Sequence, residues 1–195
     1  MNDILSDFEY VVTSILGVYL NTIGGFHLCL KEIISHQENQ LEQLRETHPE
    51  CASIEFLDST PGQYCEGNPN IPGAKVLFEC TLGEYKKRNS PGGLNHRVIG
   101  NMCIIVIYQY WEDYFRIEVA RNLGKEKDDI SSDIMGDLRL LRHSIIHHES
   151  VAIKEVENCK LLRWFKEGDE IFIDEDKFKD IISHIKVFIE TLRQG

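Results

Sequence analysis

The chain has 195 residues, of which 42% are hydrophobic and 27% are charged. That length and apolar content suit one core, so we expect a single domain over 1–195, with 48–93 as an insertion. Lys and Arg number 21 against 32 Asp and Glu, a net charge of −11. This balance argues against a protein that coats nucleic acid or a membrane, and we expect no DNA partner. A small basic site that touches a few phosphates remains compatible with it.

Six cysteines are present, and no two of them have a CxxC spacing. Three sit inside apolar runs, where a free thiol behaves as a small hydrophobic side chain. A disulfide framework is not expected at this length without an export signal. We therefore predict reduced thiols and a cytoplasmic protein.

Val11 to Leu30 is twenty residues without Asp, Glu, Lys or Arg, the length of a membrane helix. Eight of the twenty are Thr, Ser, Gly, Asn or His, and the preceding Met1–Tyr10 carries acidic but no basic residues. A secretory signal has the reverse pattern. We predict a buried core helix here and no membrane partner.

All five prolines lie between His48 and Gly93, so helices are expected outside this stretch. The first helix is predicted from Asp3 to Thr47, with a bend or break at Gly24-Gly25. Inside the insertion, Lys75–Leu82 alternates weakly and predicts a strand. The basic triplet Lys86-Lys87-Arg88 is expected in a solvated loop, and a phosphate-contacting loop is the alternative.

The second helix is predicted from Leu94 to Asn122, and it is apolar on almost every side, as in the centre of a bundle. The next helix is capped by Asp128-Asp129 or Ser131 and ends near His148. The last runs from Glu175 to Arg193. Together these predict an all-α, mainly helical protein: a bundle of four to five helices with an irregular, partly β insertion.

The segment 131–150 carries the most informative pattern. At about 100° per residue, four apolar positions form one core stripe: Ile134, Leu138, Leu141 and Ile145. A separate face holds Gly136, Arg139, Arg142 and His143, with Met135 and Ile146 alongside and His147 at its edge. Gly136 costs the helix about 1 kcal/mol relative to Ala, and it would let a partner helix approach closely across a two-fold axis.

Arginine and histidine together suit RNA cleavage by internal phosphoryl transfer. The reaction takes a proton from the 2′-hydroxyl and gives one to the 5′-oxygen, which histidine can do near neutral pH. Arginine is always charged and suits the phosphoryl oxygens of the transition state. No metal or other cofactor is then needed.

Arg142-His143-Ser144-Ile145-Ile146-His147 resembles the Arg-x4–6-His motif of HEPN-domain ribonucleases. The frame GDLRLLRHSIIHH, preceded by the aromatic-rich YQYWEDYFRIEVARNL, is similar to that superfamily over roughly 94–150. The resemblance implies Arg142 and His147 as the catalytic pair. His143 stands where these enzymes commonly have a polar residue, often Asn.

The resemblance also implies a homodimer, with Gly136 at the interface and RNA as the substrate. Family members include toxins of toxin–antitoxin systems and phage-defence effectors, so an antitoxin or regulatory protein is a further expected partner. His143 and Arg139 would bind or position RNA, and Arg139 would alternatively pair with Asp133 or Glu112. His148 is expected to face solvent away from these residues.

Three hypotheses for the function of these residues remain open. The first is a metal-independent endoribonuclease. The second is a catalytically inactive HEPN-like dimer that binds RNA or a protein partner. The third is an unrelated all-α protein whose Arg/His face is a protein interface, with its basic residues placed near the negative end of the helix dipole. Although His143 and His147 have a metal-binding spacing, no third ligand is evident and the arginines would repel a cation. The aromatic residues of the second helix could stack on bases, but they are expected in the core: Tyr108, Tyr110, Trp111, Tyr114 and Phe115.

Overall fold

The computed structural model describes residues 1–68 and 71–194. It is mainly helical with one two-stranded antiparallel sheet, which confirms the predicted mainly α class. The chain forms two compact units. Unit 1 comprises Met1–Thr22 and Arg97–Gly195, and unit 2 comprises Ile23–His96. Each unit is described by itself.

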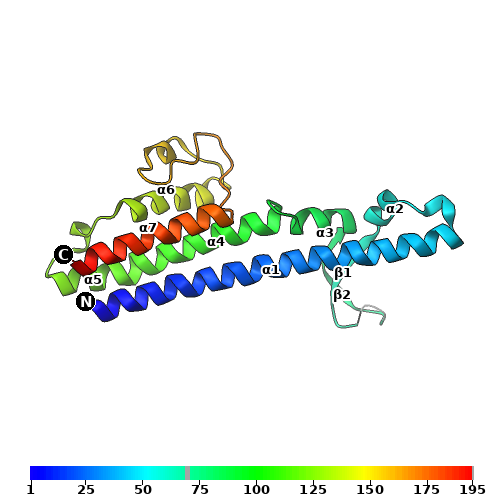
Figure 1. The fold of residues 1–195 in the computed structure, drawn as a ribbon, viewed down its shortest axis with the longest axis horizontal. Helices are drawn as coiled ribbons and strands as arrows, with labels where there is room; N and C mark the ends of the chain where they lie inside the picture. Colours follow the sequence, from blue (N-terminus) through cyan, green and yellow to red (C-terminus); the bar gives the residue numbers. More distant parts are fainter. Residues whose placement is uncertain (69–70, 195) are drawn as a thin grey trace. The chain divides into compact units, whose positions relative to one another are not determined.

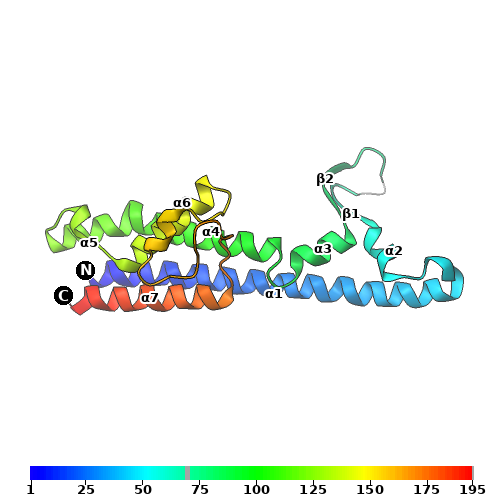
Figure 2. The ribbon, with the colours of Figure 1, turned by 90° about the horizontal axis from the view of Figure 1, so that it is seen from above.

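Unit 1 is a bundle of helices. Its members are the first part of α1 (Asn2–Thr47), α4 (Leu94–Tyr110) continuing through η2 (Trp111–Phe115) into α5 (Arg116–Leu123), and α7 (Glu175–Gln194). These run side by side in both ribbon views (Figures 1 and 2). The shorter α6 (Asp133–His147) packs on α7, after the short η3 (Lys127–Asp129). The two termini lie at the same end, where Arg193 forms an ion pair with Glu9 at 2.9 Å.

Aromatic side chains form much of the core of unit 1. The Phe8 ring lies 5.4 Å from Trp111 and 4.9 Å from Phe115, and Tyr19 lies 4.5 Å from Phe178, between ring centroids. Burial of rings of this size supplies a large part of the stability of a small domain. Tyr108, Trp111 and Phe115 are buried, as predicted, but Tyr110 and Tyr114, which were also expected in the core, are exposed.

The first helix is unbroken from Asn2 to Thr47, so a break at Gly24-Gly25 is excluded. Each glycine weakens a helix by about 1 kcal/mol relative to alanine, but it does not by itself end one. The expectation of a buried core helix also needs correction, because α1 buries one face while Tyr10 and Val18 are exposed. By length and composition alone, α1 could cross a membrane.

The second predicted helix is divided by a π turn. α4 ends at Tyr110, η2 is π-helical over Trp111–Phe115, and α5 ends at Leu123, where Gly124 adopts the left-handed conformation. The helix from α4 to α5 was expected to be buried on every side, but one of its faces is exposed, so that expectation is wrong. The exposed side chains of this face in unit 1 are Val98, Met102, Val106, Tyr110, Tyr114 and Ile117. Hydrophobicity alone does not specify what covers a helix, and nothing in the described chain covers this face.

Unit 2 contains the second part of α1, η1 (Pro49–Cys51), α2 (Ile54–Ser59), the hairpin β1 (Pro61–Glu66) and β2 (Lys75–Thr81), and α3 (Leu82–Asn89). The strand predicted at Lys75–Leu82 is confirmed as β2. Its register pairs Pro61 with Thr81, with an irregularity between Tyr64 and Cys65. The basic triplet belongs to α3 and not to a loop, because Thr81 and Glu84 form a capping box that starts a helix there.

The segment from 148 to 174 is irregular and includes η4 (Lys154–Asn158). Asp137 of α6 is buried and anchors it, because its carboxylate accepts hydrogen bonds from the backbone N–H groups of Lys160, Leu161 and Leu162 at 2.7–2.8 Å. For these three N–H groups, the carboxylate takes the place of the backbone carbonyl groups that would accept their hydrogen bonds in a strand or helix. Ser132 caps α6, one residue beyond the predicted Ser131.

Candidate functional site

The polar face of α6 carries the predicted site residues. Arg139, His143 and His147 are exposed, and Arg142 is half-buried. Met135 was assigned to the same face but is buried in the core, so that assignment is wrong. The added Cβ of an alanine at Gly136 would meet nothing within 4 Å, so this position is open in the single chain. The role of Gly136 in a dimer stays a prediction.

Arg142 is oriented by α4. One of its terminal nitrogens donates a hydrogen bond to the Gln109 side-chain oxygen at 3.1 Å, and its guanidinium lies 5.6 Å from the Tyr108 ring centroid. The Gln109 amide in turn donates to Asp113. The Nε of Arg142 is buried without a hydrogen-bond partner in the described chain. A buried donor of this kind costs free energy unless a ligand or water pairs with it.

Three histidines gather at the C-terminal end of α6. The His143 ring centroid lies 4.9 Å from that of His147 and 5.4 Å from that of His148. The i, i+4 geometry of a helix brings the first pair together, as the spacing predicted. The prediction that His148 points away is wrong, because the helix ends at His147 and the backbone of His148 is no longer helical. Among the described hydrogen bonds, none joins Arg142 to His147.

The turn directly after the histidines is strained. Glu149 and Ser150 have φ values of 53° and 66°, a region that residues other than glycine seldom adopt. Surrounding contacts hold this turn: Asn101 of α4 donates to the Ser150 hydroxyl at 3.2 Å, and the Ile171 N–H donates to the Ser150 carbonyl at 2.7 Å. Strain of this kind concentrates at functional sites, so its position beside the histidines draws attention to them.

Arg139 lies on the wall of a cavity of about 380 Å³. The lining residues come from α4, η2, α5, the loop before α6 and α6 itself: Tyr108, Trp111, Glu112, Arg116, Asp128, Ile130, Ser131, Ser132, Met135, Gly136 and Arg139. Tyr108 is thus shared between this cavity and Arg142. Burial, with the nearby charge of Glu112, raises the pKa of the Tyr108 phenol above its usual range.

Arg139 forms neither of the ion pairs expected for it. Asp133 pairs with Lys160 at 2.6 Å, and Glu112 pairs with Arg116 at 3.0 Å and with Lys127 at 2.7 Å. Burial raises the pKa of Glu112, but hydrogen bonds from Lys127 and Arg116 outweigh it and the pKa falls below its usual value. Arg139 therefore has no carboxylate partner within the described residues.

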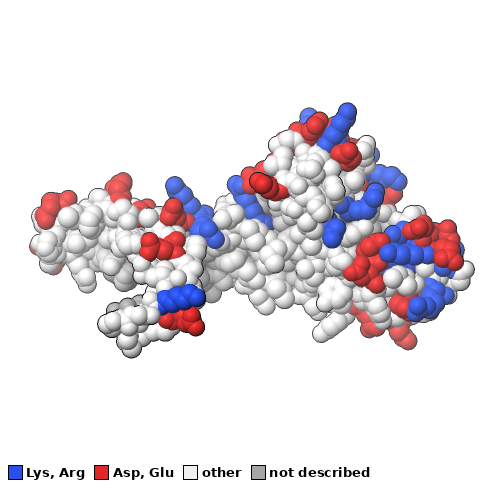
Figure 3. Space-filling model, turned by 180° about the vertical axis from the view of Figure 1, so that it is seen from behind, with Lys and Arg blue, Asp and Glu red and all other residues white. Residues whose placement is uncertain are grey.

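The charge on the face shown in Figure 3 is unevenly distributed. The view shows an area without Lys, Arg, Asp or Glu between groups of charged side chains of both signs.

The cysteines do not supply a nucleophile in unit 1. All six are free, and Cys103 and Cys159 are buried. Burial raises the pKa of Cys103 to about 11, and burial together with Asp137 raises that of Cys159 to about 12. Both thiols are protonated at neutral pH, and a protonated thiol is a poor nucleophile. Within residues 1–68 and 71–194, no group of three or more His, Cys, Asp or Glu is placed to hold a metal ion.

Sequence reasoning missed two residues that shape this site. Gln109 accepts the hydrogen bond from Arg142, and no pattern in the sequence indicates it. For Asp137 the sequence does hold an indication, because this acidic residue stands between apolar positions of the core stripe of α6. A buried carboxylate at such a position needs hydrogen-bond partners.

Comparisons with models of protein families, with curated protein sequences and with solved structures find no match to this chain. The likeness to HEPN ribonucleases thus rests on the motif and its helical frame.

Proposed function

We propose that this protein is a metal-independent endoribonuclease of the HEPN type that acts as a homodimer. The observation that carries the proposal is the polar end of α6, where an arginine oriented by Gln109 and Tyr108 precedes two histidines of the same helix and a third directly after its end. These side chains are the ones that phosphoryl transfer without a metal requires.

His147 would act as general acid and base, moving the proton between the 2′-hydroxyl and the leaving 5′-oxygen. Arg142 would stabilise the charge that builds up on the phosphoryl oxygens through its guanidinium group, which Gln109 and Tyr108 orient. His143 and Arg139, both exposed, would contact neighbouring parts of the RNA. The products would carry a 2′,3′-cyclic phosphate and a 5′-hydroxyl.

The exposed apolar face of α4 supports the proposal of a homodimer. Met102, Val106 and Tyr110 are large apolar side chains on this face, at exposed fractions of 53%, 39% and 48%. Gln109, which holds Arg142, belongs to the same stretch of helix. A second copy that covered this face would bury the apolar side chains and bring two Arg142 residues toward one seam. A role in toxin–antitoxin or phage-defence systems, with an antitoxin as regulator, belongs to this proposal by analogy with the family.

The direct test is cleavage of total RNA and transfer RNA in EDTA by the purified protein, Arg142→Ala and His147→Ala at equal folded concentration. We expect cleavage by the parent and a loss of at least about 100-fold in each variant, the usual contribution of a general acid or base. Arg121→Ala in α5 and His184→Ala in α7 change the same residue types outside α6, and both should cleave like the parent. Cleavage that survives in both site variants would contradict the assignment.

A catalytically inactive dimer that binds RNA or a protein is the second candidate. It is favoured by the engagement of Arg142 with Gln109 and Tyr108, and by His143 at the position where the family commonly has another polar residue. RNA binding without cleavage, weakened by Arg139→Ala and Arg142→Ala, would favour this candidate over the nuclease.

A further inference from the structure

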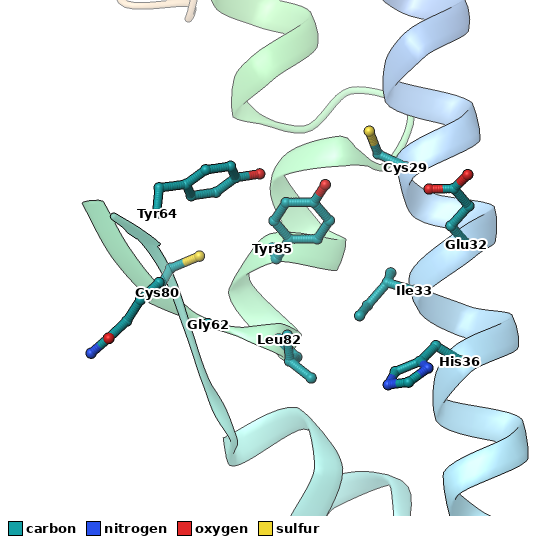
Figure 4. Close-up of a pocket in the computed structure, with 10 residues that line it drawn as sticks. Cys29, Glu32, Ile33, His36, Gly62, Tyr64, Cys80, Leu82 and Tyr85 are labelled. Carbon is teal, nitrogen blue, oxygen red and sulfur yellow. The ribbon is translucent and has the colours of Figure 1, made fainter. Parts of the chain in front are cut away.

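Unit 2 contains a cavity of about 340 Å³ that the proposed nuclease site does not use. α1, the two strands of the hairpin and α3 form its walls (Figure 4). Its volume falls in the range of small-molecule sites, which are mostly apolar with a few polar groups.

Two tyrosines form the hairpin and α3 side of this cavity. Figure 4 shows the Tyr64 hydroxyl pointing toward Tyr85, whose ring stands between the hairpin and α1. Tyr64 and Cys29 both neighbour Tyr85 in the lining of this cavity. Burial, together with the interactions with Cys29 and Tyr64, raises the pKa of Tyr85 above its usual range, so the phenol is uncharged at neutral pH.

The α1 side contributes one carboxylate and an apolar surface. Glu32 lies on this wall, and Ile33 faces the cavity with Leu82 of α3 (Figure 4). His36, one turn further along α1, adds an imidazole. No Lys or Arg is among the described residues that line the cavity. An anionic ligand would therefore meet a carboxylate without a cationic partner.

The electron-rich faces of aromatic rings attract cations, and a nearby carboxylate strengthens that attraction. We propose that this cavity binds a small organic cation, an ammonium group attached to an apolar body. The ammonium lies between Glu32 and the Tyr64 and Tyr85 rings, and the apolar body lies against Ile33 and Leu82. The site is independent of the α6 residues.

The test is calorimetric titration of the full chain with three probes of the same shape: 2-phenylethylammonium, neutral 2-phenylethanol and anionic phenylacetate. We expect the ammonium to bind at least about tenfold more tightly than the neutral probe, and phenylacetate not to bind. Equal affinity for the three probes, or no binding of the ammonium at millimolar concentration, would overturn the proposal.

Glu32→Gln removes the charge at an exposed position, where the fold is expected to tolerate it. It should weaken binding of the ammonium about tenfold and leave the neutral probe unchanged. Glu42→Gln, on the exposed surface of α1 outside the cavity, is the matched control and should bind like the parent. Unchanged ammonium binding by Glu32→Gln would place the cation elsewhere and overturn the assignment.

Discussion

The two units are stabilised in different ways. Unit 1 has a continuous apolar core that includes Phe8, Trp111, Leu138 and Phe178. Within the described part of unit 2, the buried apolar side chains are Ile23 and Leu57. Its other buried side chains are polar: Gln37, Asn89 and His96.

Polar contacts replace the missing core in unit 2. Lys86 pairs with Asp58 at 2.5 Å and donates to Gln37 at 2.9 Å, and Gln37 also donates to Asp58 at 3.0 Å. A hydrogen bond contributes about 1 kcal/mol net, less than a buried large apolar side chain. Unit 1 should therefore be the more rigid of the two units, and unit 2 should open more readily.

The largest effect is expected for Phe8→Ala in unit 1. Deletion of a buried phenyl ring costs about 3–5 kcal/mol of the free energy of unfolding, because it leaves a cavity between Trp111 and Phe115. Urea unfolding followed by circular dichroism measures this. Tyr10→Ala, at a position that is 74% exposed on the same helix, is the control and should change the free energy little. Similar effects of the two substitutions would refute the description of the core.

Lys86→Met should act on unit 2 alone. The substitution removes the ammonium that contacts both Asp58 and Gln37, which lowers the free energy of unfolding by about 1–2 kcal/mol. The hydrogen bond from Gln37 to Asp58 remains. Hydrogen exchange should become faster at amides of 54–89 and stay unchanged in α6 and α7. Lys87→Met, which alters an exposed neighbour, is the control. Equal acceleration in both units would show that they unfold together and remove the basis of the comparison.

The same network predicts a dependence on acid. Burial raises the pKa of Asp58, but hydrogen bonds from Lys86 and Gln37 outweigh it, and the pKa lies below its usual value. A carboxyl with a lowered pKa stabilises the fold above its unfolded pKa of about 4, and this stabilisation is lost as the pH falls further.

His96 should make unit 2 sensitive to pH in a higher range. Burial lowers the pKa of His96, and the neighbouring His27 lowers it further, although a hydrogen bond to the Asn89 carbonyl opposes both. The unfolded chain therefore binds the proton more readily, so stability falls as the pH drops below about 6.5. Compared at each pH, His96→Gln should show a smaller loss of amide protection between pH 7.5 and pH 5.5 than the parent. Parallel losses would contradict this role for His96.

The smallest effect concerns the turn after α6. Glu149→Gly removes the cost of a left-handed conformation, which is about 1 kcal/mol of the free energy of unfolding. Part of this stabilisation is lost because glycine gives the unfolded chain more conformational freedom. Thermal unfolding should show a Tm equal to or slightly above that of the parent. A clear loss of stability would mean that the Glu149 side chain itself holds the turn.

The sequence predicts the helices of unit 1 better than their surroundings. Apolar spacing located α6 and α7 because both bury one regular stripe. The π turn at Trp111–Phe115 shifts the register of a helix without any breaking residue, so no pattern indicated it. The irregular segment after α6 depends on Asp137, whose partners lie more than twenty residues away.

The candidate site was predicted in part. The i, i+4 spacing correctly placed His143 beside His147. The orientation of Arg142 comes from Gln109 and Tyr108 on another helix, and spacing within α6 holds no information about them. The cavity of unit 2 brings together four segments of chain, none of which has a motif of its own.

Cleavage of RNA by internal phosphoryl transfer at the α6 residues can be tested most directly on the RNA ends produced in EDTA, because this chemistry determines which end carries the phosphate. We expect a 2′,3′-cyclic phosphate on one fragment and a 5′-hydroxyl on the other, both absent with His147→Ala. A 5′-phosphate with a 3′-hydroxyl, or cleavage that requires a divalent metal, would contradict this mechanism.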